Sequence, residues 1–181
     1  MIIDRDRSLL LVLDLQVKML PAIHDHEQIL ANVVWLVRAA QKVGVPVAAT
    51  EQYAKGLGPL VPGVRTLLPD GAIAAKTRFS GVAADCLAQL PGADRAQVIL
   101  VGVESHVCLL QTALELVEEG KEVYVVADGV GSRRAFDRDV AINRMRQEGV
   151  RIVTREMVVF EWLGEADTPL FRAFSKEFFR P

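Results

Sequence analysis

Five short apolar stretches, rich in Val, Ile and Leu, constrain the fold of this chain more than any other feature. They span residues 9–13, 45–49, 98–103, 122–127 and 150–153, and a weaker stretch spans residues 72–76. A strand with one face in water alternates apolar and polar residues, whereas a strand of a parallel sheet is covered on both faces and does not alternate. The pattern therefore predicts six strands in a mainly parallel sheet.

Segments with helical periodicity separate most of these strands. In the clearest one, apolar residues recur at positions 29, 33, 36, 37 and 40, and Gly44 and Pro46 follow. This spacing gives a helix one apolar face, and glycine commonly ends a helix. Strands and helices that alternate in this way, with right-handed crossovers, predict an α/β fold: a three-layer α/β/α Rossmann-like sandwich with a six-stranded sheet.

Length and charge limit the functions open to the chain. We interpret residues 1–181 as a single domain, since no linker interrupts them. The 21 Lys and Arg residues against 23 Asp and Glu give a net charge of -2, which argues against nucleic acid or a membrane as a partner and favours a small-molecule substrate. Only 2 cysteines occur, and no targeting segment is visible, so we expect a cytoplasmic protein.

Reactive side chains follow three of the predicted strands. Asp14 follows the first strand, Lys76 ends the weak one, and Cys108 comes after residues 98–103. The carboxyl ends of parallel strands meet at one edge of the sheet, so an acid, a cation and a thiol converge there, as a cysteine hydrolase requires. Each residue also has a purely structural interpretation, as a helix N-cap, a surface charge or an inert buried thiol.

Cys108 lies one turn into the helix that follows residues 98–103. The N–H groups and the positive dipole end of a helix N-terminus favour a thiolate at such a position. His106 is only two residues away, and side chains at that spacing do not face each other, so we interpret it as a rim residue rather than a base. We interpret residues 82–90 as a helix that buries Cys86 in the core.

Three further side chains are candidates for the substrate pocket. Gln16 and Phe79 stand near two of the proposed catalytic residues, and Tyr53 follows the second strand. Structural roles for all three remain equally open. The Gly- and Pro-containing stretch 51–71 predicts a long irregular loop beside the site.

We predict neither a metal site nor a cofactor. His24 and His26 have no third ligand at metal-type spacing. No G-x-G-x-x-G motif follows the first strand, which argues against a nucleotide-binding Rossmann domain.

In combination, these residues resemble the isochorismatase-like cysteine hydrolase superfamily, and especially its isochorismatase domain-containing protein subgroup. The resemblance runs from about residue 9 to residue 154. It rests on four motifs: Asp14-Leu-Gln16, Thr50-Glu-Gln-Tyr53, Lys76-Thr-Arg-Phe-Ser80 and Gly102-Val-Glu-Ser-His-Val-Cys108.

The resemblance implies a catalytic triad of Asp14, Lys76 and Cys108. It also implies a cis peptide between Val103 and Glu104, with the backbone N–H groups of Glu104 and Cys108 forming an oxyanion hole. We therefore expect a cysteine hydrolase that cleaves a small amide or related C–N bond through a thioester. A non-catalytic small-molecule-binding or scaffolding protein is the alternative.

A metal-dependent nicotinamidase is disfavoured. Nicotinamidases carry an Asp-x-His and further histidines that bind a metal, whereas the corresponding residues here are Glu51, Gln52 and Tyr53. True isochorismatases cleave a vinyl ether without a thiol, so Cys108 favours acyl chemistry.

The C-terminal tail, residues 169–181, has aromatic residues at helical spacing. Packing onto the core is favoured over self-association through this segment. The resemblance implies a homo-oligomer, a dimer or tetramer, with the tail and residues 132–138 as candidate contacts.

Overall fold

Six parallel strands form the centre of the molecule in the computed structural model, which describes residues 1–179. The sheet order is β3-β2-β1-β4-β5-β6, and every neighbouring pair is parallel. The strands are β1 (Ser8–Leu13), β2 (Val47–Gln52), β3 (Ile73–Lys76), β4 (Gln97–Val103), β5 (Glu122–Gly131) and β6 (Arg151–Val153). The prediction of a six-stranded α/β fold is therefore confirmed.

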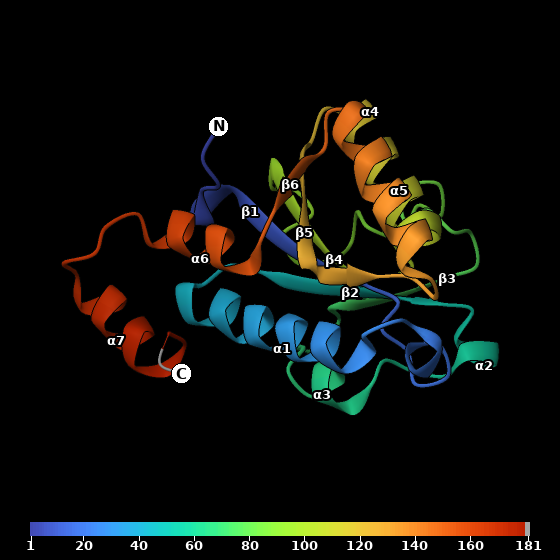
Figure 1. Cartoon of the computed structure of the whole chain (residues 1–181), viewed down its shortest axis with the longest axis horizontal. Coiled ribbons are helices and arrows are strands. Elements are labelled where there is room, and N and C mark those ends of the chain that lie inside the picture. The colour runs from blue at the N-terminus through green and yellow to red at the C-terminus, as the bar shows by residue number, and fades with distance from the viewer. Residues whose placement is uncertain (180–181) are drawn as a thin grey trace.

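Helices cover both faces of the sheet (Figure 1). On one face lie α1 (His26–Val43), α3 (Pro62–Arg65) and α6 (Arg155–Leu163), and on the other lie α4 (Leu110–Glu118) and α5 (Ala135–Gln147). The helix α7 (Pro169–Glu177) lies beyond α1, and the short α2 (Ala54–Leu57) lies at the end of β2. Single turns at Arg5–Arg7, Leu20–Ala22 and Ser105–Leu109 complete the elements. Among residues 1–179 no helix is long and apolar enough to cross a membrane.

Strand β1 shows why an unbroken apolar run predicts a central parallel strand. Leu10 and Val12 belong to the core on the α1 side, whereas Leu9, Leu11 and Leu13 belong to the core on the α4 side. All are buried. Side chains on both faces of β1 are therefore removed from water on folding. A polar side chain on either face would be buried without a hydrogen-bond partner.

At two positions the backbone conformation requires a glycine. Gly44 ends α1 with φ 81°, as its position after the helical pattern predicts. Gly102, near the end of β4, has φ 117°, and a Cβ there would lie 2.1 Å from the carbonyl oxygen of Leu13. This close contact between β4 and β1 holds the segment that carries Cys108 against the segment that carries Asp14.

Two local predictions are wrong. Residues 82–90 form turns rather than a helix, so Cys86 is only half-buried, and its Sγ donates to the carbonyl of Gly81 at 3.4 Å. The apolar residues of that segment lie instead in a loop that folds over the sheet. The stretch 51–71 is also more regular than predicted, because β2 continues to Gln52 and two short helices follow.

The aromatic tail packs onto the protein, as predicted. Phe174 is fully buried, and Phe178 meets Trp35 of α1 edge-on with ring centroids 5.5 Å apart. Lys42 and Glu177 pair across the same contact. Residues 180 and 181 of the predicted tail lie outside the described residues. The apolar side of the tail, with Phe174 at its centre, therefore packs within the chain.

Candidate active site

Three adjacent strands bring together an acid, a lysine and two polar partners. Asp14 follows β1 in the left-handed conformation, with φ 55°, and Lys76 is the last residue of β3. Strand β2 lies between them and pairs Thr50 with Leu13 and Gln52 with Lys76. The sheet order therefore places all four residues at the carboxyl edge, where ligands of α/β sheets bind.

Asp14 and Lys76 form a fully buried ion pair. Lys76 Nζ lies 2.8 Å from Asp14 Oδ2, and both side chains have 0% exposure. The hydroxyl of Thr50 donates to the other carboxylate oxygen, Oδ1, at 2.7 Å. Both oxygens of the acid are thus hydrogen-bonded, which lets the carboxylate persist away from water.

The ammonium group of Lys76 is held on three sides. Besides Asp14, it donates to Gln52 Oε1 at 2.7 Å and to the carbonyl of Phe79 at 2.9 Å. A lysine has three N–H donors. Because these three partners occupy them, Lys76 influences other groups in the site mainly through its positive charge.

Cys108 is buried beside this pair, with 3% exposure. It lies in a single π-helical turn, Ser105–Leu109, that precedes α4, and such turns are frequent at functional sites. Thr112 donates to the Cys108 carbonyl at 2.7 Å and accepts the Gly81 N–H at 3.0 Å. The turn that carries Cys108 is therefore tied to the loop that follows Lys76.

The electrostatics of Cys108 differ from the expectation for a helix N-terminus. Burial, followed by the negative charge of Asp14, raises the pKa of the Cys108 thiol to about 12, and the opposing effect of Lys76 is smaller. The prediction that the helix end favours a thiolate is wrong for the resting site, because desolvation and the neighbouring acid outweigh it. Burial and the nearby acid, Asp14, thus favour the neutral form of the thiol.

The peptide bond between Val103 and Glu104 is cis. The Glu104 side chain accepts hydrogen bonds at 3.0 Å from the backbone N–H and from Nε of Arg133. His106 Nδ1 lies 2.9 Å from the hydroxyl of Ser132. His106 is thus hydrogen-bonded to the residue that follows β5, which agrees with a position at the rim of the site.

The three predicted pocket residues have different environments. Gln16 is fully buried, and its amide is used by the backbone: it donates to the carbonyls of Gln52 and Gly58 and accepts the Gln52 N–H. These bonds tie the segment after β1 to β2 and to Gly58, and its role as a substrate contact stays a prediction. Tyr53 and Phe79 are exposed by 56% and 51%, so their rings are available to a ligand.

Sequence reasoning missed Thr50 and Gln52 as members of the site. A signal was present, because both are polar, two residues apart, and at the end of a strand that is otherwise buried on both faces. Side chains two apart share a face of a strand. A buried polar pair on one face of a central strand needs partners there, and these partners are Asp14 and Lys76.

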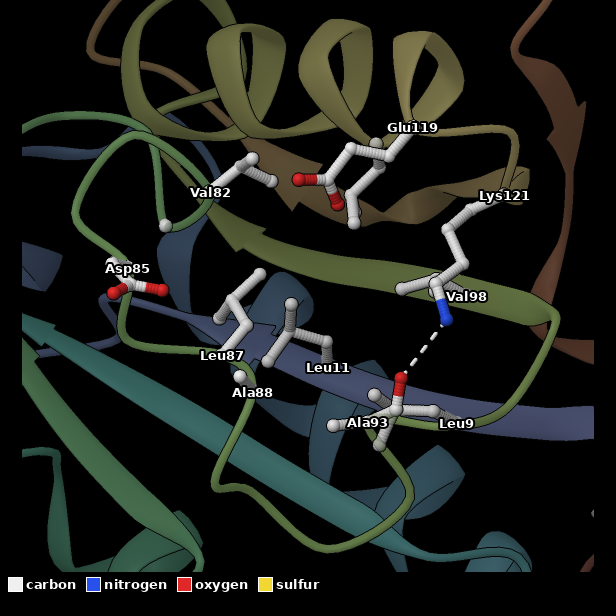
Figure 2. A pocket seen from close by; sticks show the side chains of 12 residues that line it. Leu9, Leu11, Val82, Asp85, Leu87, Ala88, Ala93, Val98, Glu119 and Lys121 are labelled. Carbon is white, nitrogen blue, oxygen red and sulfur yellow. Dashed lines mark hydrogen bonds between the residues drawn. The ribbon is translucent and has the colours of Figure 1, made fainter.

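A separate cavity of about 180 Å³ lies under α4, away from these residues (Figure 2). Leu9, Leu11 and Val98 form its floor, and Asp85 and Glu119 reach it from the loop and the helix. None of the three proposed catalytic residues lines it. Among residues 1–179, no three His, Cys, Asp or Glu side chains are grouped so that they could hold a metal.

The sequence matches a known family over most of its length. The model of the isochorismatase domain matches residues 8–157. The chain belongs to the isochorismatase family. Isochorismatase domain-containing protein 2 of Danio rerio is 39% identical to this family member over 172 residues, covering 93% of this chain and 85% of that protein.

Solved structures of similar chains have the same fold as this isochorismatase-family protein. The MAR1 ribonuclease of Caenorhabditis elegans has a TM-score of 0.88 and 36% identity, over 99% of this chain and 93% of that one. The YcaC gene product of Escherichia coli, an octameric hydrolase of unknown specificity, has a TM-score of 0.86 and 25% identity, over 98% and 91%.

Proposed function

We propose that this protein is a cysteine hydrolase that cleaves a small amide or a related C–N bond through a thioester on Cys108. The observation that carries the proposal is a buried thiol beside a buried carboxylate that is paired with Lys76. A thiol with an adjacent base, oriented by a third group, is the arrangement that nucleophilic catalysis requires.

In the first half of the proposed reaction, the Cys108 Sγ attacks the carbonyl carbon while its proton passes to Asp14. Because the thiol has a pKa of about 12, attack and proton transfer occur together rather than through a free thiolate. The backbone N–H groups of Glu104 and Cys108 would hold the oxyanion, each contributing about 3 kcal/mol. The amine leaves with the proton from Asp14.

In the second half, water attacks the thioester while Asp14 takes its proton. The bond between Sγ and the carbonyl carbon breaks, the carboxylic acid leaves, and the thiol regains a proton. Lys76 pairs with Asp14, and Thr50 and Gln52 hold the pair in place. The net reaction consumes one water and one amide.

The similarity to the Caenorhabditis elegans MAR1 ribonuclease supplies a second candidate function. A ribonuclease activity of this chain would need an RNA phosphate to reach a general acid and base. Asp14 and Lys76, with no exposed side-chain surface, are sheltered from so large a substrate. The small amide is therefore the substrate that this geometry supports best.

A panel assay separates these functions. Purified protein is incubated with small primary amides, N-carbamoyl compounds and a single-stranded RNA, and ammonia release and RNA cleavage are followed in parallel. We expect ammonia release that is lost in Cys108→Ala and kept in Cys86→Ala, the matched control. Full activity in Cys108→Ala, or RNA cleavage with every amide untouched, would contradict the proposal; inactivity on the whole panel would favour the non-catalytic alternative.

We also propose that the protein forms homo-oligomers, as the octameric YcaC does. With the tail packed on α1, the N-terminal turns of α5 are the remaining candidate contact. Phe136 is exposed by 76% and Val140 by 51%, and they lie one turn apart on the same face. Light scattering should give a mass above that of one chain, and Phe136→Glu should lower it.

A further inference from the structure

The loop at residues 80–86 follows the segment that holds the Lys76 ammonium. It consists of turns, and the backbone hydrogen bonds of these turns stay inside the loop. The residue just before it, Phe79, gives its carbonyl to Lys76 Nζ at 2.9 Å. The placement of this loop therefore bears directly on the placement of the ammonium group.

Within residues 1–179, three hydrogen bonds join this loop to the rest of the chain, and all three go to side chains of α4. The Ser80 hydroxyl donates to Glu115 Oε2 at 2.6 Å, and the Ala83 N–H donates to the same oxygen at 3.0 Å. The Gly81 N–H donates to the hydroxyl of Thr112 at 3.0 Å. Thr112 and Glu115 are therefore the polar anchors of the loop.

The loop also has apolar contacts, because Val82 packs against the core on the α4 side. Such contacts are non-directional, whereas a hydrogen bond fixes the distance and the angle between its two groups. The exact position of the loop is thus set by its two anchors on α4.

The two anchors belong to the helix that follows Cys108. Thr112 and Glu115 are three residues apart in α4 and so share one face of it. The Thr112 hydroxyl, besides accepting the Gly81 N–H, donates to the carbonyl of Cys108 at 2.7 Å. A continuous series of contacts therefore runs from the Lys76 ammonium through the loop to the turn that carries the thiol.

Glu115 holds more of the loop than Thr112 does. One of its oxygens accepts two donors, and one of these, Ser80, is buried with 1% exposure. The Ser80 hydroxyl in turn accepts the N–H of Val82 at 3.1 Å. Loss of the Glu115 side chain would therefore release the first turn of the loop from α4 and leave a buried hydroxyl without its acceptor.

We propose that Glu115 is a positioning residue of the active site. Through Ser80 and Ala83 it holds the loop that sets the Lys76 ammonium in place relative to Cys108, and it has no contact with the reacting atoms itself. The inference rests on the proposed hydrolase function. Misplacement of a catalytic group by about 1 Å can cost about 100-fold in rate, so a residue that acts in this way affects turnover from a distance.

Steady-state kinetics on an amide that the wild type hydrolyses test this role. We expect Glu115→Ala to lower kcat at least about tenfold and to change KM less than about threefold, because misplacement acts on the reacting groups. Glu115→Gln keeps an oxygen that can accept both hydrogen bonds, so its kcat should stay within about threefold of the wild type. Ser80→Ala removes one of the two bonds and should lower kcat about threefold.

Glu118→Ala is the matched control, because Glu118 is exposed on the same helix and makes no bond to the loop. Its kcat should equal that of the wild type. All rates are measured where circular dichroism shows each variant folded, so a loss of stability alone leaves kcat unchanged. Equal kcat values for Glu115→Ala and Glu118→Ala, or equal losses in Glu115→Ala and Glu115→Gln, would overturn the proposal.

Hydrogen exchange measures the anchoring without any substrate. By mass spectrometry, peptides that cover residues 77–90 should exchange at least about tenfold faster in Glu115→Ala than in Glu118→Ala, and the peptide that contains Cys108 should also exchange faster. Equal exchange in the two variants would refute the anchoring. If exchange rises in both regions but the wild type hydrolyses no amide, the proposed function fails while the coupling stands. If the wild type is active and Glu115→Ala equally so, the positioning role fails and the hydrolase stands.

Discussion

Removing the Lys76 ammonium should destabilise the whole domain, and Lys76→Met is the perturbation that shows it. The substitution keeps most of the side-chain volume but leaves Asp14 as a buried charge whose remaining side-chain partner is Thr50. It also leaves Gln52 Oε1 and the carbonyl of Phe79 without this donor. Breaking a buried ion pair from one side costs about 3–5 kcal/mol.

This cost is a large part of a total stability of about 5–15 kcal/mol. For a domain of this size, each kcal/mol of lost unfolding free energy lowers Tm by about 2–4 °C. Lys76→Met should therefore lower Tm by about 6–20 °C. The assay is urea unfolding at about pH 7, followed by circular dichroism.

Two further variants identify the cause. Lys121→Met removes a lysine that, among residues 1–179, donates to the carbonyls of Ala93 and Arg95 alone. It therefore leaves no buried charge and should cost about 1 kcal/mol. Asp14→Asn combined with Lys76→Met removes both charges and should cost at least about 2 kcal/mol less than the sum of the single variants. Additive losses, or a loss below about 1 kcal/mol for Lys76→Met, would refute the account of a coupled buried pair.

Three other outcomes follow from the structure. Because the Cys108 thiol has a pKa of about 12, its alkylation by iodoacetamide should rise about tenfold per pH unit up to about pH 10, and a plateau below about pH 9 would contradict this. Gly102→Ala should cost more than about 4 kcal/mol in urea unfolding. Gly120→Ala, which has open space around its Cβ position, should cost about 1–2 kcal/mol. Similar losses in the two variants would show that the contact between β4 and β1 does not require a glycine. Phe174→Ala should cost about 3–5 kcal/mol and the exposed Ile2→Ala less than about 0.5 kcal/mol, and a stable Phe174→Ala would show that α7 is not part of the core.

The sheet could be predicted from the sequence because its cause is local. Each strand is covered on both faces, and this leaves an apolar run that is readable without knowing its neighbours, as in β1. The segment 82–90 shows the limit of this reasoning. Its spacing of apolar residues fits a helix, but the chain folds as turns against the sheet. Of the predicted apolar face, Leu90 is buried, whereas Val82 and Cys86 are only half-buried.

The geometry of the site depends on contacts between distant segments. The strand ends of Asp14 and Lys76 are visible in the sequence, whereas the order β3-β2-β1-β4 that brings them together is set by pairing across the chain. The raised pKa of Cys108 likewise depends on burial and on Asp14, which are properties of the folded site. Local reasoning from the helix terminus could not include either one.

Mass spectrometry of an acyl-enzyme tests the central claim, that Cys108 is the nucleophile, most directly. The protein is mixed with p-nitrophenyl acetate, quenched in acid within the first turnover, and digested. The account predicts an acetyl group on the Cys108 peptide that is absent in Cys108→Ser, with Cys86 unmodified. Release of p-nitrophenol at the wild-type rate in Cys108→Ser, or an acetyl group on Cys86 alone, would contradict it.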